Sequence, residues 1–200
     1  MEDVFLPQSW ALDQVISDLH QHGFAVIDRA YEQAYLHDLV EECTENINRF
    51  REAAVQNGVV TQIRSDHILW INENLPIAQQ HINTLQQLAI TLNRAFFTSI
   101  REVEAHFACY NAGEFYTLHR DNPQQKNDRV FSAVYYLHEQ WQSHWGGQLR
   151  LQDVHQDWHI IEPAPNRLVI FQSDLLHEVL KAQQQRLSIT AWLRSGLVLW

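Results

Sequence analysis

Cysteine and positive charge are both scarce in this 200-residue chain. Its two cysteines, Cys43 and Cys109, lie far apart and without the spacing of a metal site. We therefore expect neither a disulfide framework nor a thiolate zinc cluster. The scarcity of cysteine instead suits a protein of a reducing compartment. Lysine and arginine total 14 against 24 aspartates and glutamates, which gives a formal net charge of −10. Because an acidic chain repels phosphate backbones, nucleic acid is disfavoured as a substrate.

The chain also lacks two kinds of apolar segment. It does not open with a basic stretch followed by an apolar one, and no apolar run approaches the length of a membrane span. We therefore expect a cytoplasmic protein with no membrane partner. With 46% hydrophobic and 19% charged residues, the composition is that of a globular protein, and the length suits one domain spanning residues 1–200.

Helical patterns dominate the first half of the chain. Residues 9–22, 32–50 and 76–97 are expected to form helices because their apolar residues recur at helical spacing, with Ser9 as the first N-cap. Residues 24–28 predict a short strand, and 64–70 a strand or an extended loop. Asn57-Gly58 is typical of a turn.

From residue 103 onward the pattern changes to short runs typical of strands, separated by turn residues. The expected strands are 103–110, 115–119, 131–137, 148–151, 158–161, 167–171, 177–180 and 186–194. Many short strands after a helical layer predict an α+β fold. Its core would be a jelly roll, or double-stranded β-helix, at 101–195, and helices from residues 1–100 would buttress it.

The last expected strand alternates between two kinds of side chain. Arg186, Ser188, Thr190 and Trp192 fall on one face, and Leu187, Ile189, Ala191 and Leu193 fall on the other. This pattern suits a sheet with a polar site on one face and helices on the other. The strand at 131–137 divides in the same way, which directs Tyr136 toward the interior that Arg186 faces.

Three side chains form a candidate metal site. His119 and Asp121 are two residues apart, so on a strand they would point to the same face, and His177 opens a later strand. Two histidines and one carboxylate are the facial triad of non-haem Fe(II) oxygenases. One His-x-Asp pair is weak evidence in a chain with 12 histidines. Arg186, nine residues after His177, could hold the far carboxylate of a 2-oxo diacid.

The order of these motifs resembles the Fe(II)/2-oxoglutarate-dependent dioxygenases, in particular their prolyl 4-hydroxylase branch of the hypoxia-factor type and its bacterial relatives. The resemblance covers roughly residues 60–195. The matching segments are Ile63-Arg64-Ser65-Asp66-x-Ile68-x-Trp70, Ala108-Cys109-Tyr110, His119-x-Asp121-Asn122-Pro123, Tyr135-Tyr136-Leu137, Trp145-Gly146-Gly147-x-Leu149-Arg150-Leu151, and Ile189-Thr190-x-Trp192.

The resemblance implies a reaction and a set of roles. Fe(II), 2-oxoglutarate and O2 would hydroxylate a C–H bond and yield succinate and CO2, with ascorbate as a candidate reductant. His119, Asp121 and His177 would bind the iron, and Arg186 would grip 2-oxoglutarate in two-point fashion. The cosubstrate pocket would also include Tyr136, Tyr110, Thr190 and Leu149. Trp192 would border the substrate side of the iron.

A second implied feature is a mobile loop over the substrate that carries Arg64, Asp66 and Trp70. The alternative is that Arg64 and Asp66 form a plain surface ion pair of little consequence. The segments around 60–75 and 122–130 are expected to shape the substrate site. The apolar end Leu197-Val198-Leu199-Trp200 must pack on its own domain or on a partner, which leaves the oligomeric state open.

The favoured substrate is a prolyl residue of a protein or peptide, and three alternatives stay open. The first is a free amino acid or small metabolite. The second is repair demethylation of nucleic acid, which would use Arg194 as a second arginine after Arg186. The third is a non-catalytic metal-binding or oxygen-sensing module with the same fold.

Two further motifs are set aside. His155 and His159 have helical zinc spacing, but Gln156 replaces the required glutamate, and the segment is expected to form a hairpin. His119-Arg120-Asp121 also spells the kinase catalytic triplet. The chain lacks the accompanying kinase motifs, so the kinase interpretation fails.

Overall fold

The computed structural model describes residues 6–53, 63–122 and 128–196. Three sequence predictions lie wholly or mostly outside these residues: the Asn57-Gly58 turn, the segment around 122–130 expected to shape the substrate site, and the packing of Leu197–Trp200. Within the described ranges, every strand expected between 103 and 194 is present, with ends shifted by at most two residues.

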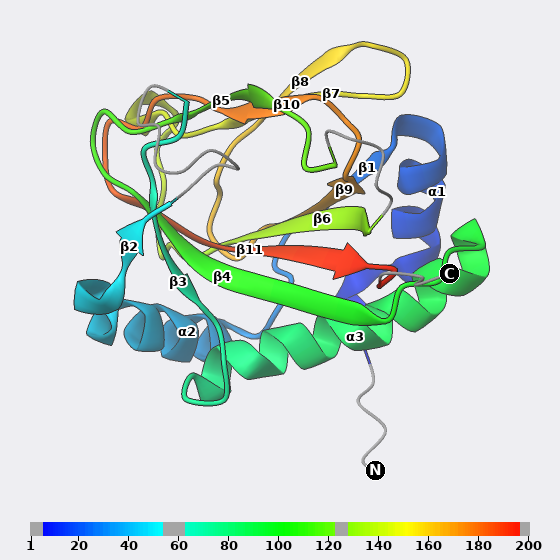
Figure 1. The fold of residues 1–200 in the computed structure, drawn as a ribbon, viewed down its shortest axis with the longest axis horizontal. Coiled ribbons are helices and arrows are strands. Elements are labelled where there is room, and N and C mark those ends of the chain that lie inside the picture. Colours follow the sequence, from blue (N-terminus) through cyan, green and yellow to red (C-terminus); the bar gives the residue numbers. More distant parts are fainter. Residues whose placement is uncertain (1–5, 54–62, 123–127, 197–200) are drawn as a thin grey trace.

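The strands of the described residues form two facing antiparallel sheets (Figure 1). The seven-stranded major sheet has the order β1 (Phe24–Ile27), β9 (Leu168–Gln172), β6 (Arg129–Tyr136), β11 (Arg186–Arg194), β4 (Glu102–Tyr110), β3 (His67–Trp70) and β2 (Arg51–Glu52). The four-stranded minor sheet has the order β5 (Tyr116–His119), β10 (His177–Val179), β7 (Leu149–Gln152) and β8 (Trp158–Ile161). This confirms the jelly-roll prediction.

Strand β11 lies at the centre of the major sheet, and its side chains identify the face toward the apolar core and the face toward the minor sheet. It pairs with β4 along its whole length, Arg186 opposite Tyr110 and Arg194 opposite Glu102, and with β6 on its other side. Leu187, Ile189, Ala191 and Leu193 join the large apolar core, as the alternation predicts. The face with Arg186 and Thr190 therefore looks into the space between the sheets.

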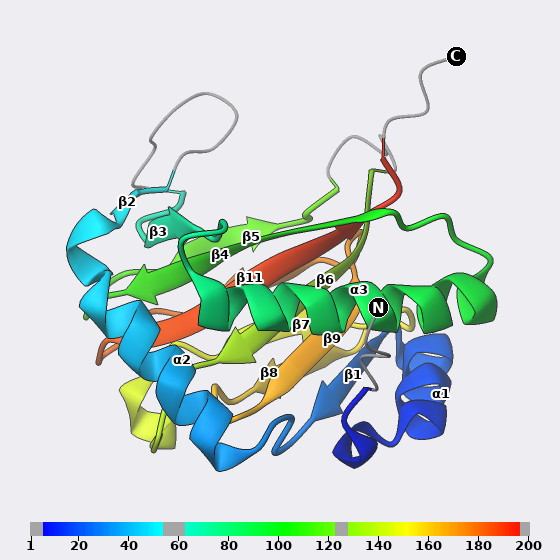
Figure 2. The same ribbon diagram turned by 90° about the horizontal axis from the view of Figure 1, so that it is seen from below.

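Three helices lie against the outer face of the major sheet (Figures 1 and 2): α1 (Leu12–His22), α2 (Gln33–Glu45) and α3 (Pro76–Phe96). Helix α3 begins with proline in its first turn and buries Leu85, Leu88 and Leu92. Glu42 of α2 accepts the N–H groups of Ile77 and Ala78, at 3.0 and 2.8 Å. This carboxylate caps the start of α3 and couples the two helices.

Two helix predictions need correction. Ser9 does not cap α1, because Ser9 and Trp10 form a separate 3-10 turn (Gln8–Trp10) and Ala11, with a φ of 43°, breaks the chain before Leu12. The buried Trp10 indole fixes this turn by donating to the Ala30 carbonyl at 2.6 Å. The predicted helix 32–50 is also two elements, since α2 ends at Glu45 and a 3-10 turn follows at Ile47–Arg49.

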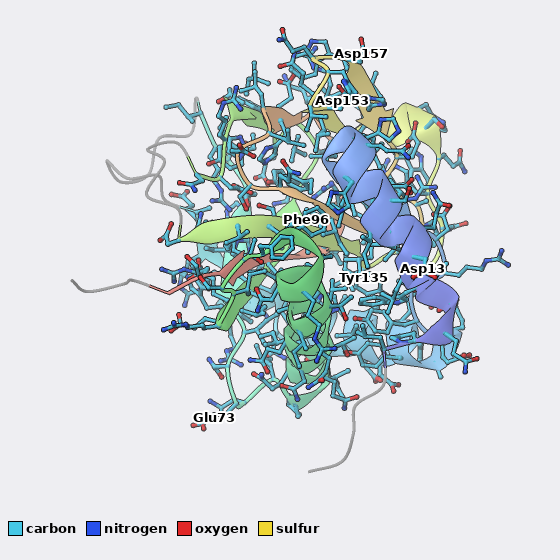
Figure 3. All side chains as sticks on the ribbon, turned by 90° about the vertical axis from the view of Figure 1, so that its right-hand side faces the viewer. Asp13, Glu73, Phe96, Tyr135, Asp153 and Asp157 are labelled. Atoms are coloured by element: carbon cyan, nitrogen blue, oxygen red, sulfur yellow. The ribbon has the colours of Figure 1, made fainter. Side chains whose placement is uncertain are left out.

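The segment with His155 and His159 is the predicted hairpin, formed by β7 and β8. Asp153 organises its turn by accepting the N–H groups of residues 155 and 157, at 2.8 and 2.9 Å, while His159 Nε2 lies 2.9 Å from its other oxygen. Figure 3 shows Asp153 and Asp157 at this turn, beside the end of α1. In the part of the chain that the structure describes, no helix has both the length and the apolar character to cross a bilayer.

Candidate active site

The three candidate metal ligands come together at the edge of the minor sheet. His119 ends β5 and lies directly across from His177, the first residue of β10, with ring centroids 4.2 Å apart. Asp121 follows β5 in a bend instead of continuing the strand, so the shared-strand-face reasoning was wrong in detail. One ligand atom from each of the three residues nevertheless lies within 4.8 Å of the others.

Backbone carbonyls orient both imidazoles. His119 Nδ1 lies 2.7 Å from the Thr117 carbonyl, and His177 Nδ1 lies 3.0 Å from the Leu175 carbonyl. Since a carbonyl can only accept, each Nδ1 carries the proton and donates it. In the neutral imidazole Nε2 is then free to bind a metal, and both Nε2 atoms face Asp121, 3.5 Å from Oδ1 for His119 and 3.6 Å from Oδ2 for His177.

The protonation states of this cluster also suit a metal. Burial lowers the pKa of His177 to about 4, so its imidazole is neutral at neutral pH. Burial alone would raise the pKa of Asp121. Attraction to His177, contacts with His119 and a hydrogen bond from Ser132 outweigh burial and hold that pKa well below its usual range. Neutral imidazoles and an ionised carboxylate are the ligand set that Fe(II) takes in such sites.

An unpaired cation lies deeper between the sheets. The Arg186 side chain is 2% exposed and lies between the rings of Tyr110 and Tyr136, 4.9 Å from each centroid. Its Nε donates to the Gly147 carbonyl at 2.9 Å and its Nη1 to Ser188 Oγ at 3.1 Å. Among the described residues no carboxylate lies within ion-pair distance of it. Among the same residues, the buried Tyr136 hydroxyl has no hydrogen-bond partner.

A buried cation beside an unsatisfied hydroxyl is costly unless an anion completes the site. The Arg186 guanidinium and the Tyr136 hydroxyl therefore suit the predicted binding of a carboxylate of 2-oxoglutarate. A single cavity connects this pocket to the metal ligands. Its lining residues are Arg64, Tyr110, Tyr116, His119, Asp121, Val134, Leu149, Phe171, His177, Val179, Arg186, Thr190 and Trp192.

Part of the segment expected to carry a mobile loop over the substrate is a strand, which confirms the strand alternative for residues 64–70. His67–Trp70 is strand β3, hydrogen-bonded between β2 and β4, and the Asp66 side chain is fully buried. Arg64 binds Asp66 through two bonds of 2.6 and 2.9 Å, so the pair is not the weak surface pair of the alternative interpretation. Of the three predicted residues only Arg64 reaches the cavity.

Arg64 and Trp70 contact different residues of the site. Arg64 covers the ring of Tyr116 at 4.8 Å, and Tyr116 stacks on His119 with centroids 3.6 Å apart. Arg64 is therefore linked to the candidate metal ligand His119 through the ring of Tyr116. Trp70 is 47% exposed and lies near Trp192, with ring centroids 6.2 Å apart. Trp70 is therefore available at the outer surface next to a residue that lines the cavity.

Several cavity and support residues were missed from the sequence. Tyr116 and Phe171 contact the metal-ligand rings, and Ser132 and Ser173 lie behind Asp121. Ser132 could have been found, because it shares the alternating face of Tyr136 on the same strand. Ser173 follows strand β9, and no sequence pattern there indicates its contact with Ser132.

Taken together, a jelly roll with a His-Asp-His cluster next to a buried arginine defines the class of non-haem iron oxygenases. Residues 105–194 match the 2OG-Fe(II) oxygenase superfamily. The chain is 35% identical to a prolyl-4-hydroxylase of Pseudomonas putida, with a TM-score of 0.85 over 92% of this chain and 98% of the other. The chain belongs to the 2OG-Fe(II) oxygenase superfamily, and it is a dioxygenase similar to the prolyl hydroxylases.

Two further relatives support this assignment. A prolyl hydroxylase of Trichoplax adhaerens, solved with a peptide fragment of the hypoxia-inducible factor, is 27% identical and has a TM-score of 0.84, with 94% of each chain covered. An uncharacterised PKHD-type hydroxylase of Synechocystis is 26% identical over a 179-residue alignment that covers 77% of this chain. The match spans 58% of the length of that cyanobacterial relative.

Proposed function

We propose that this dioxygenase hydroxylates a prolyl residue of a protein or peptide to 4-hydroxyproline, with O2 and 2-oxoglutarate converted to succinate and CO2. In this proposal residues 1–200 act as one catalytic domain. The observation that carries it is the His119–Asp121–His177 cluster, which shares one cavity with the buried and unpaired Arg186. A metal and an organic anion can therefore bind side by side.

The proposed ligands of the iron are His119, Asp121 and His177. When bound, Fe(II) supplies the redox chemistry that activates O2 and oxidises a C–H bond. The protein's part is to hold three donor atoms on one side, so that three coordination positions remain for the cosubstrate and O2. The carbonyls of Thr117 and Leu175 keep both imidazoles in the tautomer that this task needs.

The proposed partner of Arg186 is the distal carboxylate of 2-oxoglutarate. Hydrogen bonds to the Gly147 carbonyl and to Ser188 Oγ fix the guanidinium, so little freedom is lost when it binds an anion. The Tyr136 hydroxyl would donate its unused proton to the same carboxylate. In this proposal Tyr110, Thr190 and Leu149 line the pocket around the carbon chain, in agreement with their place in the cavity.

The proposed substrate side is the outer rim of the cavity, where Trp192 and the exposed Trp70 lie close together. Two aromatic rings at a pocket mouth suit a polypeptide with a proline ring, since such rings offer a large apolar contact. The prolyl hydroxylase likeness at 35% identity supports this substrate class. Arg64 would act at the inner side of the same rim, and Asp66 would hold Arg64 in place.

The nucleic-acid alternative loses its main support. Arg194, the candidate second arginine, donates to Glu104 at 2.8 Å and to Asp128 at 3.1 Å. An arginine that two carboxylates already neutralise is a poor phosphate or base ligand. The net charge of −10 acts in the same direction.

Substrate-dependent formation of succinate tests the proposal. Proline-containing peptides should stimulate succinate release and gain the mass of one oxygen atom at proline, whereas the same peptides with alanine at that position should do neither. A parallel series with and without ascorbate tests whether it serves as the reductant. If free L-proline outperformed every peptide tested, the small-metabolite alternative would replace the protein substrate.

A further inference from the structure

Two buried serines lie behind the carboxylate of Asp121. Ser132 of β6 is fully buried, and its Oγ lies 2.6 Å from Asp121 Oδ2. Ser173, which follows β9 and is 1% exposed, has its Oγ 2.9 Å from Ser132 Oγ. We propose that Ser132 and Ser173 are positioning residues that make Asp121 a one-oxygen ligand. This inference rests on the proposed function, because it concerns the proposed iron site.

The direction of the hydrogen bonds follows from the charge of Asp121. An ionised carboxylate can only accept, so the Ser132 hydroxyl must donate its proton to Oδ2. With that proton committed, Ser132 can only accept from its neighbour, and the Ser173 hydroxyl is the donor between them. The result is a one-way chain from Ser173 through Ser132 to Asp121, in which each bond strengthens the next.

The main chain fixes both serines. Ser132 is in register with Trp192 of β11 on one side and Phe171 of β9 on the other, so its backbone cannot shift without disturbing the sheet. The Ser173 N–H donates to the Val130 carbonyl, and the Ser173 carbonyl accepts from the Asn122 N–H, both at 3.1 Å. The loop that carries Asp121 is therefore held through its backbone and its side chain at the same place.

The consequence for the metal is the number of oxygens that it can bind. A carboxylate that is free to rotate can offer both oxygens, and the second would occupy a position needed by 2-oxoglutarate or O2. The two carboxylate oxygens lie at similar distances from the histidines, Oδ1 3.5 Å from His119 Nε2 and Oδ2 3.6 Å from His177 Nε2. The bond from Ser132 occupies Oδ2, so Oδ1 is the oxygen that this inference assigns to the metal. Hydrogen bonds of this kind orient metal ligands and tune their affinity.

The plain alternative is that the two hydroxyls only satisfy each other inside the core. Ser132 stands between Phe131 and Ala133 in the middle of a strand, where a buried hydroxyl is costly unless it is bonded. A pair serving only packing would need no third partner, yet Ser132 makes its shorter bond to Asp121. The two interpretations differ in what happens to metal binding.

Titration of the metal-free protein with Co(II), without cosubstrate or substrate, separates them. Calorimetry gives the affinity, and visible absorption reports the coordination of the cobalt. Ser132→Ala should weaken Co(II) binding about tenfold to a hundredfold and change the visible spectrum. Ser132→Thr keeps the hydroxyl and should restore both. Ser173→Ala should cause the same spectral change with a smaller loss of affinity.

Ser188→Ala is the matched control, because it removes an equally buried hydroxyl that contacts Arg186 and not Asp121. It should leave Co(II) binding unchanged and weaken 2-oxoglutarate binding. The inference is overturned if Ser132→Ala keeps the original affinity and spectrum, or if Ser132→Thr fails like Ser132→Ala. If Ser132→Ala does not fold, an unchanged spectrum in Ser173→Ala overturns it. Failure of the unaltered protein to bind Co(II) would instead overturn the proposed function, and this inference with it.

Discussion

The two faces of strand β11 are both buried, yet they have opposite chemistry. The face toward the helices carries Leu187, Ile189, Ala191 and Leu193, all part of the large apolar core. The face toward the minor sheet carries Arg186 and Ser188, at 2% and 0% exposure, followed by Thr190 and Trp192. Burial on the first face contributes to stability, whereas burial of a charge and hydroxyls on the second face costs it.

The two faces of β11 should therefore contribute to different properties of the protein. The helix-facing side should matter for the free energy of unfolding and little for chemistry. The side facing the minor sheet should matter for binding and be nearly neutral, or even unfavourable, for stability, as unpaired buried charges generally are. Changes on one face should therefore leave the property of the other face intact.

The largest effect is expected from His177→Ala. It removes one of three proposed ligands, from strand β10 of the minor sheet that the polar face of β11 looks toward, and should abolish 2-oxoglutarate turnover while the protein stays folded. Succinate formation and circular dichroism, measured together, check this. Near-normal succinate production would show that the ligand assignment is wrong.

Arg186→Lys should have the next largest effect, since a two-point grip on a carboxylate becomes a single contact. The loss of a hydrogen bond to a charged group is worth about 1.5–3 kcal/mol, or about tenfold to a hundredfold in 2-oxoglutarate affinity. Calorimetric titration with 2-oxoglutarate measures it, and metal affinity in the same variant serves as the control. Unchanged cosubstrate affinity would exclude the proposed role.

A residue on the other face of β11, Ile189, should respond in the opposite way. Ile189 is 0% exposed, and Ile189→Ala leaves a cavity beneath the helices, at a cost of about 2–5 kcal/mol in the free energy of unfolding. Denaturant unfolding measures the loss. At a temperature where the variant is folded, its metal affinity should match that of the unaltered protein. A strong loss of metal binding would show that the two faces are coupled.

A smaller effect concerns a titratable group on the helix side. His81 of α3 is 0% exposed and shares a 2.7 Å hydrogen bond with the Tyr31 hydroxyl, and burial lowers its pKa to about 3. Below about pH 6.5 the His81 imidazole is protonated in the unfolded chain but stays neutral in the folded protein. The free energy of unfolding therefore falls as the pH drops from about 6.5 toward 3.

Replacing this group should make the acid loss shallower. His81→Gln removes one titrating site, which is worth up to about 1.4 kcal/mol per pH unit in that window. Urea unfolding at pH 7, 6 and 5 measures the slope, and the exposed His37→Gln serves as the control. An identical slope in both variants would show that His81 is not protonated on unfolding in this range.

Much of this division could be predicted from the sequence. Alternation along residues 186–194 identified both faces of β11, because a strand has a fixed period of two. His119, Asp121, His177 and Arg186 were found because their residue types and order are demanding. Helix ends were less predictable. The break at Ala11 depends on the Trp10 indole bonding to Ala30, a contact between residues that no local pattern relates.

The parts of the site that were missed depend on tertiary contacts. The stack of Arg64, Tyr116 and His119 joins a segment before α3 to one after β4, so no spacing within either segment indicates it. For the same reason the sequence predicts only a strand or an extended loop for residues 64–70, since β4, the pairing partner of β3, lies beyond α3. The role of a single residue such as Ser173 depends on its tertiary contacts, which the local sequence does not indicate.

The most direct test of the account is an anaerobic titration of the protein with Fe(II) and 2-oxoglutarate, followed by visible absorption. A 2-oxo acid bound through two oxygens to Fe(II) gives a charge-transfer band that neither component gives alone. We predict one such band that saturates at one equivalent of each. It should be lost in His177→Ala, require more 2-oxoglutarate in Arg186→Lys, and persist in Ile189→Ala. No band in the unaltered protein, or an undiminished band in His177→Ala, would contradict the assignment of the polar face as the active site.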